Sequence, residues 1–170
     1  MKVCIEGTWG LKSTRECVED AHECGSQWAD NSTNLCVDVC PVLDGTFGDE
    51  DTRICVPICP EGTYADDYTR TCVERCPEHN GVHDTYGNNE TNICEEVCQE
   101  EGAFADPQTL NRYCVLECSQ DPEESFADPS TKTCVPRCPT HPSLFGETDN
   151  YDCVEECVDP YFADTHTRRC

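Results

Sequence analysis

The hydrophobic positions of this chain recur at a long interval, and each recurrence is one aromatic residue followed directly by alanine or glycine. Eight of the nine copies carry threonine five residues after the aromatic, and a cysteine closes each copy a few residues later. Such internal self-similarity is typical of a tandem-repeat protein. We expect the aromatics to form the core of the repeat. They are Trp9, Trp28, Phe47, Tyr64, Tyr86, Phe104, Phe126, Phe145 and Phe162.

The residues around each aromatic predict a short hairpin. In GTYADDYTRTC, residues 62–72, tyrosine and threonine favour extended backbone, and Asp66 can make a turn by accepting a hydrogen bond from the backbone two residues on. We therefore expect small disulfide-rich repeats of short β-hairpins and irregular loops, with little or no helix, in an extended rod or solenoid-like array. Each aromatic is expected to pack over its own disulfide and onto the neighbouring module.

Cysteine content explains how such small units could be stable. The chain has 18 cysteines in 170 residues, whereas only 36% of its residues are hydrophobic. This density normally replaces apolar burial by covalent cross-links and requires an oxidising compartment, so we expect a secreted or extracellular surface protein. With two cysteines each, the nine predicted modules are residues 4–17, 24–36, 40–55, 59–72, 76–94, 98–114, 118–134, 138–153 and 157–170.

Three regular disulfide pairings fit the repeat, because sequence alone does not fix disulfide connectivity. Pairing within each CxxxC linker leaves Cys4 and Cys170 without partners, and linking like positions of adjacent modules leaves orphans because nine is odd. Pairing within each module uses every cysteine and is the favoured scheme. Its bridges are Cys4–Cys17, Cys24–Cys36, Cys40–Cys55, Cys59–Cys72, Cys76–Cys94, Cys98–Cys114, Cys118–Cys134, Cys138–Cys153 and Cys157–Cys170.

The charge of the chain limits the classes of molecule that it can bind. There are 35 acidic and 11 basic residues, a net charge of -24, and no basic stripe that could neutralise phosphates. We therefore expect no nucleic-acid partner. The sequence also lacks the run of about 18 apolar residues that a membrane span needs, so no membrane insertion is expected in this segment. The acid-rich turns leave a calcium-stiffened extracellular rod as an alternative, although no loop has the D-x-[DN]-x-[DN]-G pattern.

Residues 59–77, CPEGTYADDYTRTCVERCP, resemble the extracellular cysteine-rich repeats of ciliates and other protists. They are also loosely similar to furin-like and growth-factor-receptor cysteine-rich modules. The resemblance extends over the chain through its nine copies, and it implies an extracellular rod, coat or fibril without specifying one activity. The long linker CVEDAHEC, residues 17–24, departs from the pattern and puts a uniform geometry in doubt there.

Two N-glycosylation sequons occupy the same repeat position. Asn31 in NST and Asn89 in NET each lie three residues after the aromatic, and the threonine of the repeat completes each sequon. Because this position falls in the predicted exposed turn, we expect N-linked glycans on both asparagines. Chance occurrence of the sequon is the alternative.

Metal and catalytic sites are not indicated. Structural zinc needs four clustered ligands, and a uniform series of two-cysteine units suits disulfides better. The five histidines share no repeat position, and no Ser/His/Asp or Cys/His arrangement recurs. We therefore expect no enzymatic activity, and no cofactor other than glycans.

The two ends of the sequence reproduce the spacing of an internal linker. Seven of the eight linkers place two cysteines four residues apart, and joining Cys170 to Met1 gives the same spacing as C-MKV-C. This predicts either that the nine modules are one period of a longer chain or that copies of the chain meet head to tail. Head-to-tail contact implies a structural subunit of a glycosylated extracellular fibril, surface coat or appendage. A receptor or adhesin stalk that binds a ligand through its variable loops is the competing hypothesis.

Overall fold

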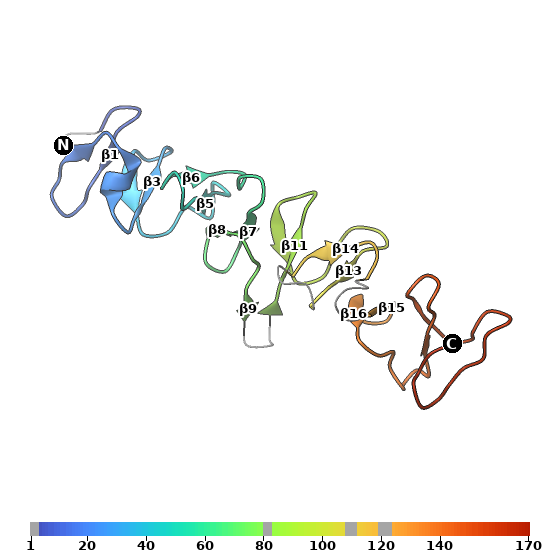
Figure 1. The fold of residues 1–170 in the computed structure, drawn as a ribbon. Coiled ribbons are helices and arrows are strands. Elements are labelled where there is room, and N and C mark those ends of the chain that lie inside the picture. Colours follow the sequence, from blue (N-terminus) through green and yellow to red (C-terminus); the bar gives the residue numbers. More distant parts are fainter. Residues whose placement is uncertain (1–3, 80–82, 108–111, 119–123) are drawn as a thin grey trace. The chain divides into compact units, whose positions relative to one another are not determined.

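The structure is a computed structural model that describes residues 4–79, 83–107, 112–118 and 124–170 (Figure 1). The expected junction at Met1 lies outside the described residues. The chain forms two compact units. The first comprises Met1–Glu74 with Thr91–Cys94, and the second comprises Arg75–Glu90 with Glu95–Cys170.

The first unit contains two sheets. The first sheet has the order β2-β1-β4-β3. In the second sheet, the strands that belong to this unit have the order β12-β7-β8-β5-β6. The strands are β1 (Trp9–Gly10), β2 (Cys17–Val18), β3 (Trp28–Asp30), β4 (Leu35–Val37), β5 (Phe47–Gly48), β6 (Cys55–Val56), β7 (Tyr64–Asp66), β8 (Thr71–Val73) and β12 (Ile93–Glu95).

The second unit contains the strand pair β10-β9, the sheet β14-β13-β16-β15 and the strand pair β17-β18. Its strands are β9 (Glu78–His79), β10 (His83–Asp84), β11 (Tyr86–Asn88), β13 (Phe104–Ala105), β14 (Cys114–Val115), β15 (Phe126–Asp128), β16 (Thr133–Val135), β17 (Phe145–Gly146) and β18 (Cys153–Val154).

The predicted class of small disulfide-rich repeats built from short β-hairpins with little helix is confirmed, since the described chain consists of small disulfide-linked β units in tandem. Each strand has two or three residues, and the helix in the described part of the chain is a single 3-10 turn, η1 (Ala21–Cys24). This turn lies within the long linker CVEDAHEC, where the Asp20 carboxylate caps it by accepting a hydrogen bond of 2.9 Å from the His22 N–H. The extra linker residues are thus absorbed as one helical turn.

Within a module the two strands pair antiparallel in one recurring register. The small residue after the aromatic lies opposite the closing cysteine, as Ala29 lies opposite Cys36, and the aromatic lies opposite the valine that follows, as Trp28 lies opposite Val37. The same register recurs in β5/β6, β7/β8, β15/β16 and β17/β18. Each disulfide therefore closes the loop that leads into its own hairpin.

The cysteines are bonded in the pairs that the phase of the repeat favours. The bridges are Cys4–Cys17, Cys24–Cys36, Cys40–Cys55, Cys59–Cys72, Cys98–Cys114, Cys118–Cys134, Cys138–Cys153 and Cys157–Cys170. Cys76 and Cys94 are disulfide-bonded as well, and no cysteine is free. All 18 cysteines thus serve as cross-links.

Candidate functional site

The feature that recurs most faithfully is the contact between consecutive modules, which we call the joint. At every joint the N–H of the small residue after one aromatic donates to a carbonyl of the next module, for example Gly48 to Arg70 at 2.9 Å. The acceptor lies two residues before the closing cysteine. The pairs are Gly10–Asn34, Ala29–Arg53, Gly48–Arg70, Ala65–Asn92, Gly87–Arg112, Ala105–Lys132, Ala127–Tyr151 and Gly146–Arg168. The same backbone hydrogen bond therefore links each of the nine modules to the next.

The acceptor residue has a left-handed backbone in every module. Its φ lies between 53° and 63°, a region that residues other than glycine seldom adopt. Asn34 and Asn92 suit this region, whereas arginine, lysine or tyrosine occupies it elsewhere at some cost in backbone energy. In the described chain, every residue other than glycine that has a positive φ occupies this repeat position. These residues are the eight joint acceptors and the equivalent Arg15 of the first module. Sequence reasoning missed this position, although its enrichment in arginine was a usable signal.

Six of the aromatics pack on disulfide cysteines of the following module. For these six, our prediction that the ring packs onto the neighbouring module is confirmed, and our prediction that it packs over its own disulfide was wrong. Trp9 clusters with Cys24 and Cys36, and Phe126 clusters with Cys138 and Cys153. The pleat of the hairpin explains this. The closing cysteine lies opposite the small residue and shares its face, while the adjacent aromatic points to the other face. An aromatic therefore cannot cover its own bridge, and the next module supplies one.

The small residue is required because the preceding aromatic lies against it. A Cβ added at Gly48 would come within 2.5 Å of the Trp28 indole, and one at Gly146 within 2.6 Å of the Phe126 ring. Alanine occurs at the same place in other modules, where Ala29 packs with Trp9 and Ala65 with Phe47. The strict Ala/Gly position thus marks the surface that receives the preceding ring.

A cation from the next module covers the ring at five joints. The guanidinium carbon of Arg70 lies 4.0 Å from the centre of the Phe47 ring, and that of Arg112 lies 4.6 Å from the Tyr86 ring. The other pairs are Arg53–Trp28, Lys132–Phe104 and Arg168–Phe145. These cations belong to the left-handed acceptor residues, so one residue supplies the carbonyl to the backbone bond and the charge to the ring.

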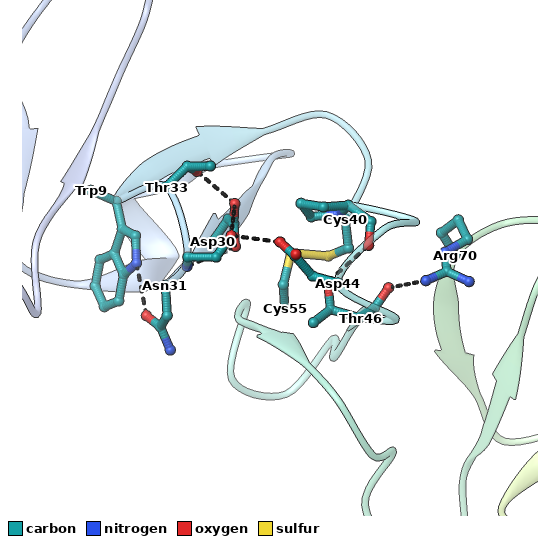
Figure 2. Close-up of a disulfide and its surroundings, with 11 residues drawn as sticks. Trp9, Asp30, Asn31, Thr33, Cys40, Asp44, Thr46, Cys55 and Arg70 are labelled. Carbon is teal, nitrogen blue, oxygen red and sulfur yellow. Dashed lines mark hydrogen bonds between the residues drawn. A yellow bond between two sulfur atoms is a disulfide. The ribbon is translucent and has the colours of Figure 1, made fainter.

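Three of the four arginines of this set also bond the carbonyl just before the ring they cover. Arg70 donates to the Thr46 carbonyl at 2.7 Å, a bond that Figure 2 shows beside the Cys40–Cys55 disulfide. Arg112 donates to the Thr85 carbonyl at 3.3 Å, and Arg168 donates to the Leu144 carbonyl. The joint is therefore held by a backbone bond, a buried ring and a charged side chain together.

Replacing Arg70 by asparagine is expected to destabilise the Phe47 joint by about 1–2 kcal/mol, because it removes the cation over the ring and the bond to Thr46. Asparagine keeps the left-handed backbone, as it does at two other joints. Hydrogen exchange of the amides in residues 46–73 would measure the effect. Arg75→Asn is the matched control, since that side chain is 51% exposed, and an equal loss in both variants would contradict the assigned role.

Two joints differ in detail. The Trp9 indole N–H donates to the Asn31 amide oxygen at 3.1 Å, which Figure 2 also shows. The Phe126 ring lies 6.1 Å from the Tyr151 ring, with the Arg169 guanidinium 5.5 Å away. The ring is thus met by a polar, aromatic or cationic partner from further along the chain in each case.

The predicted aromatic core holds for most modules but not for the last. Seven of the nine aromatics are 9% exposed or less, and Phe104 is partly buried. Phe162 is 87% exposed and belongs to no core, which corrects our prediction for that residue. The physical reason is that each ring is buried by the module after it, and no described residue lies over Phe162.

The acids after the small residues make the turn of the hairpin. Asp66 accepts from the Tyr68 N–H at 3.1 Å and from the Thr69 hydroxyl at 2.6 Å. Asp30 accepts from Thr33 at 2.5 Å in the same way (Figure 2). The recurring threonine is therefore the partner of the recurring acid. These carboxylates, which motivated the calcium alternative, already accept hydrogen bonds within their own turns.

Asp128 gives this turn a measurable pH dependence. Burial alone raises the pKa of its carboxyl, but hydrogen bonds from Ser130 and Thr131 outweigh burial and hold the pKa below its ordinary value of 3.8. A depressed folded pKa adds stability above the ordinary value, and this stability is lost as the pH falls through the folded pKa. The charged form of Asp128 thus stabilises its module at neutral pH.

Asp128→Asn is expected to cost about 1 kcal/mol at neutral pH, and the difference from the wild type should shrink as the pH falls from neutral through the depressed folded pKa of Asp128. Denaturant unfolding across this pH range would measure it. Glu155→Gln, which removes an exposed acid in a linker, serves as the control. A difference between the wild type and Asp128→Asn that stays constant with pH would contradict the assigned charge effect.

Both sequon asparagines, Asn31 and Asn89, are exposed in the turn where they were expected. A glycan attaches to the amide nitrogen, so the bond from Trp9 to the Asn31 oxygen can persist beside it. In the described ranges no group of three or more histidine, cysteine or acidic residues is placed to hold a metal ion.

In the described part of the chain, no helix has both the length and the apolar character that a membrane crossing requires.

The chain was compared with families, curated proteins and solved structures, and it has no match among them.

Proposed function

We propose that this chain is a structural subunit of a glycosylated extracellular fibril, surface coat or appendage in which copies join head to tail. The observation that carries the proposal is the joint, because the same backbone bond recurs at all eight junctions. A unit that repeats one contact along its sequence is suited to continue that contact between copies, which generates an open filament.

The energetics of a single module favour such a role. A disulfide that closes about 15 residues contributes about 3 kcal/mol, whereas ordering those residues costs on the order of 20 kcal/mol. The hairpins are only two or three residues per strand, so a module cannot bury enough surface by itself. Burial of each ring under the next module supplies the missing stabilisation, and an assembly of this kind has its weakest point at an uncovered end.

The surface supports an extracellular setting. Eighteen disulfide-bonded cysteines need an oxidising compartment, and the two exposed sequons are open to glycosylation. The net charge of -24 keeps such an object soluble and limits lateral association of copies. End-to-end contact is then favoured over bundling.

Electron microscopy of the full chain, expressed through a eukaryotic secretory pathway, tests the proposal. We expect thin filaments, and intact mass before and after removal of N-linked sugar should differ by the glycans on Asn31 and Asn89. Monomers under native conditions would overturn the structural role. An assembly without sugar would remove only the glycan part.

A ligand-binding stalk is the second candidate, and one loop favours it. The loop before Tyr86 carries the strand pair β9–β10, and Arg112 of the next module bonds Glu78 at 2.9 Å and lies 3.6 Å from Asp84. A variable loop held in this way could present a binding surface. Exchanging this loop for that of another module should abolish partner binding if the stalk hypothesis is right, and should leave filaments intact if it is not.

A further inference from the structure

We propose that the exposed face of the ninth module binds the first module of a second copy through the same joint, with Phe162 of one copy under Arg15 of the next. This inference rests on the proposed function and names the surfaces that would carry it. Its occupant is a second copy of this chain, and the contact is non-covalent because Cys4, Cys17, Cys157 and Cys170 are already paired.

The ninth module presents one half of the joint. Phe162 is 87% exposed, and Tyr161 beside it is 44% exposed, whereas the aromatics of seven other modules are at most 9% exposed. In the described residues the Ala163 N–H has no hydrogen-bond acceptor, although its counterpart donates at all eight internal joints. An apolar ring and an unpaired donor therefore lie together on this face.

The first module presents the other half. Arg15 has the left-handed backbone of the joint acceptors, with a φ of 63°, and its side chain is exposed, with no aromatic ring of the described residues beneath it. Its carbonyl accepts no bond from the described residues. Gly10 stands where a preceding ring packs at other joints, and the nearest atoms to an added Cβ there are those of Leu35, Cys4 and Asn34, not of a ring. This face thus lacks only the aromatic.

The internal joints specify how the halves meet. Arg70 and Arg168 show that an arginine at this position covers the preceding ring and bonds the carbonyl just before it. By that pattern the Arg15 guanidinium covers Phe162 and bonds the Tyr161 carbonyl, while the Ala163 N–H donates to the Arg15 carbonyl. The joint buries both exposed features and leaves no new polar group unpaired.

The test compares Phe162→Ala, which damages the tail, with Arg15→Glu, which damages the head. Both residues are exposed, so each variant should fold as the wild type does. Leu43→Ala and Lys12→Glu are the controls, because each makes a change of the same kind, apolar truncation or charge reversal, at an exposed site outside the joint. Analytical ultracentrifugation at about 0.15 M salt, where charge repulsion is screened beyond about 8 Å, would report assembly.

We expect each end variant to weaken end-to-end association by at least about tenfold and both controls to polymerise normally. Mixing the two end variants should yield dimers and nothing longer, because one intact tail meets one intact head. Polymers that form from either end variant would overturn this joint and leave the fibril proposal standing. Closed wild-type rings that need both Phe162 and Arg15 would support the joint and overturn the open fibril, and a monomeric wild type would overturn both.

Discussion

Phe126→Ala is expected to destabilise the second unit by about 3–5 kcal/mol, whereas Phe162→Ala should change the stability of the monomer by less than about 0.5 kcal/mol. The two residues hold the same repeat position, but Phe126 is 1% exposed and Phe162 is 87% exposed. Truncating Phe126 leaves a cavity beside Cys138 and Cys153, while Phe162 has no cover to lose. Repeat position alone would predict equal effects.

Hydrogen exchange is the suitable measurement, since modules of a repeat array can unfold separately and one global free energy is then undefined. Amides of residues 126–153 should lose protection in Phe126→Ala, and those of the first unit should not. The Phe162 variant must be studied as a monomer, by dilution. A large loss of stability in monomeric Phe162→Ala would show that the ring is buried by its own module, contrary to the structure.

Much of the fold follows from the order of residues in the repeat. The spacing of cysteines to the aromatic and the pattern of small residue, acid and threonine dictate a hairpin whose turn is made by an Asp–Thr pair, as at Asp66 and Thr69. These interactions join residues close in sequence, so the sequence can predict them. The module boundaries follow for the same reason, because each disulfide spans at most 16 residues among the described bridges.

The joint was harder to foresee because it depends on which face of a hairpin a side chain occupies. Phe47 and Gly48 are neighbours in sequence, yet they point to opposite faces and meet different modules. The partner of Phe47 is Arg70, in the next module, at a position that its left-handed backbone and its enrichment in arginine distinguish. The exposure of Phe162 has the same origin, since burial is conferred by the next module.

The direction of packing has a further consequence for the disulfides. Phe126 contacts the bridge of the following module, Cys138–Cys153, while its own bridge, Cys118–Cys134, packs with Ala127 and Phe104. The two bridges close loops of similar length, with sequence separations of 15 and 16. Their direct effects through the entropy of the unfolded chain should therefore be nearly equal, at about 3 kcal/mol each. A difference between the two bridges in their coupling to Phe126→Ala must therefore come from the contact between the Phe126 ring and one of them.

Removing both cysteines of the following bridge, by Cys138→Ala with Cys153→Ala, is expected to cost about 2–5 kcal/mol and to couple to Phe126→Ala by about 1–3 kcal/mol. Once the bridge is lost the ring has less to pack on, so its truncation costs less. The matched pair Cys118→Ala with Cys134→Ala should cost about as much but combine with Phe126→Ala additively, to within about 0.5 kcal/mol. Denaturant unfolding followed by hydrogen exchange gives both double-mutant cycles. Coupling confined to Cys118–Cys134 would reverse the direction of packing along the chain.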